Sequence, residues 1–309
     1  MPRATATVSF QAIELKGSLL PASLLEQVAR LQAPLQKEAD YGLAKGERLR
    51  EQIDAAWVRL KELWQEYRDL RERAAQSVAG LHLAQRLLRE VLGWADLQPC
   101  DGWQHGDSHY PISHRAFAAP QAHGATSAGA SQGPSQGTSQ GPSQGSVPLI
   151  LRGLPADQLD KGSSAFGQEG RRRSPHSCLQ ECLNADDNAN WGLLLSGDRL
   201  RLLHDNPSLV KPAYLQVDLE LLVEGELFDE FATLWLLLHA SRFRHPQTGS
   251  CVLDAWKEQA QEAGERVLGQ LRHGVQQALE ALGNGLLQHP ANDQLDRKST
   301  RLNSSHANI

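Results

Sequence analysis

Three consecutive arginines, Arg171 to Arg173, form the only dense basic run in the chain. Guanidinium groups bind phosphate oxygens through charge-assisted hydrogen bonds, so such a run could hold the backbone of DNA. A solvated surface loop would carry the same three charges without a ligand. The run is therefore a candidate DNA-binding site, with a plain surface loop as the alternative.

Two weaker patterns contain the residue types of a magnesium-dependent nuclease. Glu14-Leu15-Lys16 has the carboxylate-x-lysine form, in which carboxylates hold Mg²⁺ and a lysine steers the attacking water. Asp157, Asp160 and Lys161 are a looser version of it. The Asp that should precede the first pattern is absent from residues 1–13. Neither pattern therefore predicts a catalytic residue, and we assign none.

Cys178 and Cys182 lie four residues apart on a predicted helix, with His176 nearby, and raise the question of a zinc site. A structural zinc site needs a second pair of ligands, which the sequence does not supply at the usual spacing. We interpret the two cysteines as small core residues and assign no metal site.

Two further strings resemble cofactor or base-binding loops. Gly283-Asn284-Gly285 follows a predicted helix instead of a strand and lacks the third glycine of a dinucleotide loop, so we interpret it as a helix end. Asn206-Pro207-Ser208-Leu209 lacks the second proline and the aromatic of the loop with which amino-methylating enzymes hold a flipped base. We interpret it as a turn.

Composition is typical of a globular protein. The chain has 309 residues, of which 40% are hydrophobic and 22% charged, and this length suggests about two domains. The formal net charge of -5 argues against a chain that holds nucleic acid by bulk electrostatics alone but permits a local basic face. Four scattered cysteines, an N-terminus without an apolar signal core and the lack of a membrane-length apolar run indicate a cytoplasmic protein with no membrane partner.

Helices are predicted through most of the first hundred residues. Ser23 to Leu31 reads as a short helix with Ser23 as its N-cap, and Leu81 to Val91 as another that ends at Gly93. Between them, residues 45–76 form a long amphipathic helix. Its apolar residues recur at three- and four-residue intervals and include an aromatic stripe, which we interpret as core and not as a base-stacking surface: Leu49, Ile53, Trp57, Leu60, Trp64, Tyr67 and Leu70.

The clearest strand signal lies between residues 191 and 219. Trp191 to Leu195 and Arg199 to Leu203 are apolar runs joined by a Gly-containing turn, and Tyr214 to Leu219 supplies a third strand. Ser174 and Pro175 predict the start of a helix that reaches Leu183. Three more helices are predicted after the meander, at residues 228–243, 251–263 and 266–282.

Residues 121–146 consist almost entirely of Gly, Ser, Ala, Gln, Thr and Pro and are predicted to form a disordered insertion or linker. It separates Tyr110-Pro111-Ile112-Ser113-His114 from the apolar stretch Pro148 to Leu151. If these two are strands of one sheet, the insertion is an expanded loop inside a domain. The fold class predicted is α+β, mainly helical, with a small and mostly antiparallel sheet and a C-terminal helical segment.

Several segments, taken in order, resemble the N-terminal region of large bacterial type II restriction-modification proteins, in which restriction and adenine-specific DNA methylation are fused in one chain. These segments are residues 43–49 leading into the Trp57 helix, 110–115, 174–177 with 180–184, 191–206, 214–219, 234–243, and 283–285 with His289-Pro290.

The resemblance implies a parent protein that transfers a methyl group from S-adenosylmethionine to adenine N6 in a domain beyond this one. It implies a nuclease-like, or degenerate nuclease-like, region here, with Mg²⁺ if the parent cleaves DNA. Arg152-Gly153 follows the strand Pro148 to Leu151 where Glu-x-Lys would be expected. We therefore expect a non-catalytic scaffold that contacts DNA and binds no cofactor itself. A divergent Mg²⁺-dependent endonuclease and a helical interaction module are the alternatives.

These expectations divide the chain into four parts. Residues 1–100 are a helical N-terminal region, residues 101–220 a small α+β domain that contains the insertion, and residues 221–295 a helical connector. Residues 296–309 resemble a sequencing adapter translated in frame, which would make the chain a fragment; a natural polar tail is the alternative.

Overall fold

A computed structural model describes residues 9–17, 19–117, 146–153, 156–168, 170–206 and 211–288. The chain forms two compact units, residues 1–257 and 258–309, which we describe separately. Most of the predicted insertion, residues 121–146, and the whole of the tail, residues 296–309, lie outside the described residues.

Seven strands of the first unit form one sheet, in the order β1-β11-β10-β9-β6-β5-β2. Only β6 and β9 are parallel, and every other neighbouring pair is antiparallel. The α+β class and the mostly antiparallel sheet are thus confirmed. The strands are β1 (Ile13–Lys16), β2 (Asp96–Pro99), β5 (His114–Phe117), β6 (Ser146–Leu151), β9 (Trp191–Ser196), β10 (Arg199–His204) and β11 (Tyr214–Asp218).

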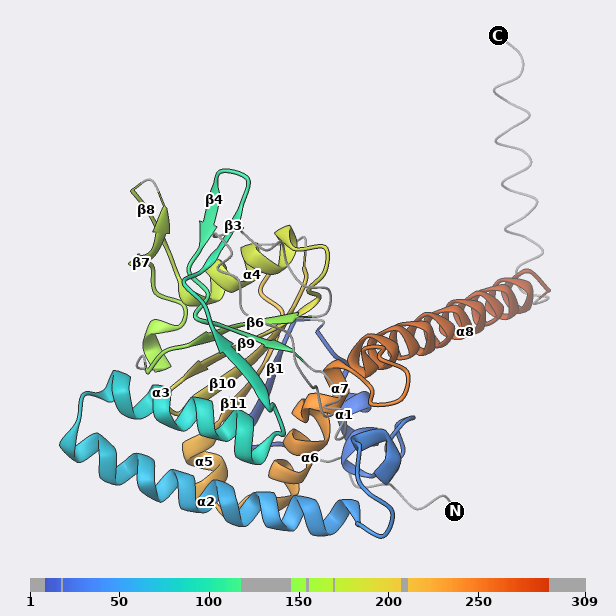
Figure 1. Ribbon diagram of the computed structural model, residues 1–309. Helices are drawn as coiled ribbons and strands as arrows, with labels where there is room; N and C mark the ends of the chain where they lie inside the picture. Colours follow the sequence, from blue (N-terminus) through green and yellow to red (C-terminus); the bar gives the residue numbers. More distant parts are fainter. Residues whose placement is uncertain are drawn as a thin grey trace, which may run out of the picture. The chain divides into compact units, whose positions relative to one another are not determined.

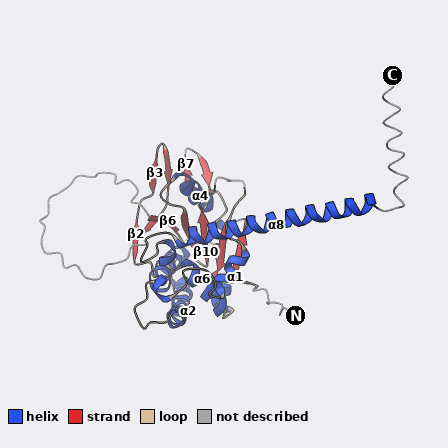
Figure 2. Ribbon diagram, turned by 90° about the vertical axis from the view of Figure 1, so that its right-hand side faces the viewer, coloured by secondary structure: helices blue, strands red, loops and turns tan. Residues whose placement is uncertain are grey.

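Helices cover both faces of this sheet (Figures 1 and 2). One face packs against α3 (Gln76–Arg86) and α5 (Leu219–Glu224), with α2 (Leu49–Arg73) outside them. The other face packs against α4 (Pro175–Ala185). This unit also contains the helices α1 (Ala22–Ala29), α6 (Phe228–Leu238) and α7 (Ala240–Phe243), the 3₁₀ turns η1 (Glu38–Tyr41) and η3 (Ala156–Gln158), and the π-helical turn η2 (Leu87–Val91).

The central strands are apolar on both faces because each face is covered by helices. Ile150, Leu194 and Leu203 belong to the core under α4. Their strand neighbours Leu149 and Leu193 point to the opposite face and are also fully buried. This double burial explains why the sequence at 193–195 is an unbroken run of leucines instead of an alternating pattern.

The aromatic stripe of α2 is core, as predicted. Trp57 lies 5.0 Å from the ring of Phe231 and Trp64 lies 5.2 Å from Tyr67, measured between ring centroids. The start of α1 differs from the prediction, because its N-cap is Pro21 and Ser23 lies within the first turn. The helix predicted to end at Gly93 does end there, but through η2 and a left-handed Gly93 with φ of 72°.

The three expected segments before residue 257 do not form separate units. β1 and β2 come from residues 1–100 and occupy the two edges of the same sheet. Helix α6, which follows residue 220, packs on α1 and α2. The physical reason is strand pairing: an edge strand of four residues has no stability alone and must add to an existing sheet.

Two glycines let α3 approach the sheet closely. A Cβ on Gly80 would lie 2.5 Å from the Cα of Gly153, so no larger residue fits without movement of the backbone. We expect Gly80→Ala to lower the free energy of unfolding by roughly 1–3 kcal/mol, as overpacking does. Urea unfolding followed by tryptophan fluorescence would measure this. Gly269→Ala is the control, because that helical glycine has open space around it and its replacement should cause no loss; equal effects would contradict the packing argument.

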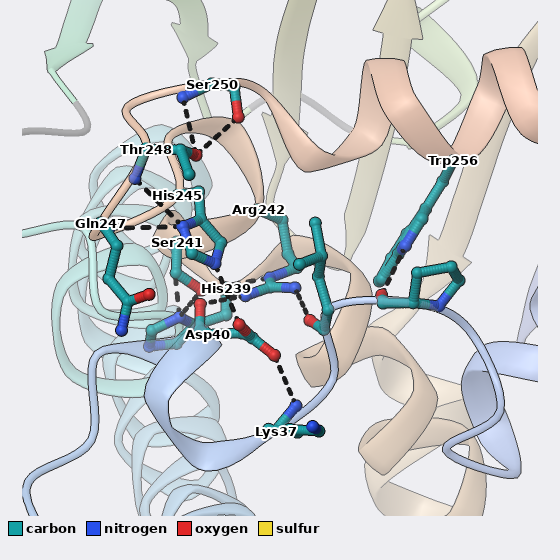
Figure 3. Close-up of polar contacts among 12 residues, drawn as sticks. Lys37, Asp40, His239, Ser241, Arg242, His245, Gln247, Thr248, Ser250 and Trp256 are labelled. Atoms are coloured by element: carbon teal, nitrogen blue, oxygen red, sulfur yellow. Dashed lines mark hydrogen bonds and ion pairs between the residues drawn. The ribbon is translucent and has the colours of Figure 1, made fainter.

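A buried arginine joins the end of the helical layer to the N-terminal segment (Figure 3). The predicted helix 228–243 breaks at His239, whose extended backbone separates α6 from α7. Arg242 in α7 is fully buried. Its guanidinium donates to the backbone oxygens of Leu35 and Asp40 and lies 3.8 Å from the centroid of the Tyr41 ring.

Neighbouring polar contacts complete this junction. His245 Nε2 lies 3.1 Å from Asp40 Oδ1, and the Asp40 carboxylate also accepts from the backbone N–H of Lys37. Trp256 donates from Nε1 to the backbone oxygen of Pro34 at 2.8 Å. Residues 34–41, residues 242–245 and Trp256 are therefore held together at one point of the first unit.

Helix α8 (Val252–Gln288) is continuous. The prediction of two helices, and of a helix end at Gly283-Asn284-Gly285, was wrong, because glycine inside a helix costs only about 1 kcal/mol and does not by itself stop it. Val252, Leu253 and Trp256 are buried in the first unit. None of the helices described here is both long and apolar enough to cross a membrane.

Candidate nucleic-acid interface

Two β-hairpins stand next to α4 on the same side of the main sheet (Figures 1 and 2). The first is formed by β3 (Trp103–His105) and β4 (Ser108–Tyr110), and the second by β7 (Ser163–Gln168) and β8 (Arg171–Arg173). Gly106 and Gly170, at the two turns, have positive φ of 55° and 81°, which glycine adopts without strain. Strands β4 and β7 are in contact, so the two hairpins lie side by side.

Arg173 fastens these hairpins to each other. It donates to the backbone oxygens of Phe166 in β7 and His109 in β4, at 2.8 Å each. It also pairs with Glu181 of α4 at 2.9 Å and lies 5.4 Å from the centroid of the Tyr110 ring. Only 7% of its side chain is exposed. Arg173 is therefore engaged inside the protein and is not placed to contact DNA.

Arg171 and Arg172 differ from it in both exposure and pairing. Both are exposed, and neither forms an ion pair within the described residues. They lie on β8 directly after the turn at Gly170, and successive strand residues point to opposite faces of the hairpin. The structure thus divides the predicted basic run into two exposed arginines and one internal clamp.

Aromatic and cationic side chains line the first hairpin and its base. Trp103, which is half-buried, stacks on Tyr110 with 5.5 Å between centroids, and the guanidinium of Arg115 lies 5.6 Å from the Trp103 ring. Arg152 lies 5.1 Å from the ring of Phe166 at the base of the second hairpin. Of these rings only Trp103 is partly exposed, since Tyr110 and Phe166 are buried, so Trp103 is the one ring in this group that a flat base could reach.

The two nuclease-like patterns lie on the α4 face of the sheet, toward β1. Glu14 on β1 is opposite Gln216 on β11, which is opposite Arg201 on β10. Arg201 binds both carboxylate oxygens of Asp160, at 2.8 and 3.1 Å, and Gln216 at 2.7 Å. Hydrogen bonding to Arg201 holds the pKa of Asp160 below its usual value. The carboxylate of Asp160 is therefore already occupied by a cation of the protein.

The neighbours of Arg201 are also engaged. Its guanidinium lies 4.0 Å from the Tyr214 ring and 3.1 Å from Nδ1 of His176. Burial, followed by the charge of Arg201, lowers the pKa of His176 to about 4. Asp157 pairs with Lys161 instead of joining Asp160. Across the described ranges, no three His, Cys, Asp or Glu side chains form a group that could hold a metal ion.

The remaining predicted residues have structural roles. Cys178 and Cys182 are fully buried under the sheet, where burial raises the pKa of Cys178 to about 12. Ser174 caps α4 as expected, because its Oγ accepts from the N–H of Ser177 at 3.0 Å. Residues 207–209 of the Asn206 string lie outside the described residues.

Sequence reasoning missed the partner hairpin and the clamp. The residues 103–110 contain a Gly-Asp turn between short polar strands, which is a hairpin signal that could have been read. Comparison with protein families, with curated proteins and with solved structures found no match to this chain.

Proposed function

We propose that this chain is the DNA-contacting N-terminal part of a restriction-modification protein. A further domain of that protein would methylate adenine N6 with S-adenosylmethionine, and no residue of this chain is assigned to that cofactor or to catalysis. The proposal rests on the sequence resemblance and on one structural observation: two exposed arginines on a hairpin that Arg173 fastens in place.

The contacts that Arg173 makes with its surroundings support this reading over a solvated loop. A flexible loop would lose conformational entropy each time that it bound a phosphate. Here the strand that carries Arg171 and Arg172 is already ordered by the contacts of Arg173 to β4, β7 and α4. Two-stranded ribbons can enter the major groove of DNA, where phosphates lie on both sides.

The test is salt-dependent binding of the full chain to duplex DNA, measured by fluorescence anisotropy. We expect Arg171→Ala with Arg172→Ala to weaken binding about 10-fold or more and to reduce the slope of log K against log salt by about 2, since each phosphate contact releases counterions. The control is Arg48→Ala with Arg50→Ala, which removes the same charge from exposed positions at the start of α2. Equal losses in the two variants, or no salt-sensitive binding by the parent chain, would refute the proposal.

The endonuclease alternative has less support from the geometry. Asp160 and the Glu14-x-Lys16 pattern do share one face of the sheet, but Arg201 occupies the carboxylate of Asp160. A magnesium ion would have to displace that guanidinium. DNA cleavage that depends on Mg²⁺ and is lost in Asp160→Asn would favour the alternative.

A further inference from the structure

The second unit exposes a long apolar surface on α8. Seven aliphatic side chains of this helix have exposed fractions between 51% and 71%. We name them the α8 stripe: Val267, Leu268, Leu271, Val275, Leu279, Leu282 and Leu286. A few isolated exposed leucines are ordinary on a protein surface, but a contiguous row of this length marks an interaction site.

The stripe occupies one face of the helix. Its members from Leu268 to Leu286 follow one another at intervals of three or four residues, which places them in a line along a helix with 3.6 residues per turn. The opposite face is polar throughout and carries Arg266, Gln270, His273, Gln277 and Glu280. This is the distribution of a helix that packs on one side and is solvated on the other.

The composition of α8 disfavours an isolated, unpacked helix. Five glycines lie in its exposed part, at positions 264, 269, 274, 283 and 285, and each costs about 1 kcal/mol of helix stability relative to alanine. A helix of such low propensity depends on packing for its stability. The long internal segment outside the described residues, 118–145, contains no Leu, Ile, Val, Phe, Tyr or Trp and so offers no large apolar side chain to pack on it.

We propose that the α8 stripe binds the same stripe of a second copy of this chain. Counting roughly 100 Å² for each aliphatic side chain, two copies would remove more than about 1,000 Å² from water, close to the size of specific protein interfaces. That area comes from one helix of each copy, as in a two-stranded coiled coil.

The flanks of the stripe are compatible with self-pairing. The charged residues beside it are one glutamate and one arginine, Glu265 and Arg272, so two parallel copies bring no like charges together across the seam. The opposite flank carries Gly274 and Ala281. In a parallel pair, Leu279 and Leu286 of one copy lie beside these small residues of the other, and large side chains meet small ones.

The oligomeric state of the full chain tests this inference. It is obtained from the mass in solution, measured by sedimentation over a wide range of concentration. We expect a dimer that dissociates on dilution. Leu271→Glu with Leu279→Glu should weaken dimerisation at least 10-fold, because the charges would be buried in the seam. Gln270→Glu with Gln277→Glu adds the same charges to the polar face and should leave the dimer intact.

A second measurement separates loss of pairing from loss of folding. Tryptophan fluorescence reports the first unit, and its unfolding curve should be the same in both double variants. Helical circular dichroism of the parent chain should increase with concentration as α8 pairs. A parent chain that is monomeric at every concentration, or equal dissociation of both double variants, would overturn the inference, as would a stripe occupied only by a different protein.

Discussion

Arg242→Met is expected to lower the free energy of unfolding by about 3–5 kcal/mol, the range found when one partner of a buried charged network is removed. Methionine has a similar length and keeps most of the packing, so the loss arises from polar groups. The backbone oxygens of Leu35 and Asp40 would lose their donor in the interior. The contact between the guanidinium and the Tyr41 ring would also be lost.

Chemical unfolding followed by tryptophan fluorescence is suited to this prediction, because Trp235 and Trp256 lie beside the junction. Arg244→Met is the matched control, since Arg244 is two residues away and exposed, and its replacement should change stability by less than about 0.5 kcal/mol. Arg242→Lys should fall between the two, because a lysine keeps the charge but cannot reproduce the planar fork. A loss below about 1 kcal/mol in Arg242→Met would show that the network contributes little.

Acid is expected to destabilise the protein between about pH 6.5 and pH 4, through the buried His176 and the partly buried His239. Burial, with the nearby charge of Arg242, lowers the pKa of His239 to about 3, and His176 is lowered to about 4. An unfolded histidine has a pKa of about 6.5. Below that pH the unfolded chain takes up protons that the folded chain cannot, so stability is fully present above pH 6.5 and is lost as pH falls.

For His239 alone the expected loss on going from pH 7 to pH 4 is about 3 kcal/mol. The geometry supports a lowered pKa of His239, because Nδ1 accepts from the N–H of Ser241 and Nε2 lies close to Gly93, where an added Cβ would come within 2.7 Å of it. His239→Asn keeps an acceptor for the cap of α7 without a titrating ring. Unfolding free energies measured across this pH range should be flatter in that variant, and an unchanged slope would contradict the assignment.

Local features of the fold could be predicted from the sequence because they depend on neighbours in the chain. The stripe of α2, the cap at Ser174 and the 191–218 meander all follow from periodicity, capping or turn chemistry. The pairing of β1 with β11 could not be predicted, because it depends on which edge of a finished sheet is free. The helix break at His239 is also a tertiary effect, in which the buried contacts of Arg242 outweigh a strong helical pattern.

The sequence predicts only part of the candidate interface. The three arginines at 171–173 stand out by charge, but their division between surface and interior depends on the carbonyl of His109, which is 64 residues away in the chain. The same limit applied to Asp160, whose partner Arg201 lies 41 residues later on another strand. Sequence spacing identifies charged groups, but it does not reveal which of them are already paired.

The pairing of β1 with β11 also constrains how the protein reaches its native state. Ile13 meets Val217, so β1 has no partner until about two hundred further residues have been synthesised. Contacts this distant in sequence slow folding, because a long loop must close before any stabilisation is gained. The central meander of β9, β10 and β11 is local and can form first, with β1 added last as the edge. During synthesis, residues 9–17 are therefore the part of this sheet that waits longest in an unpaired state.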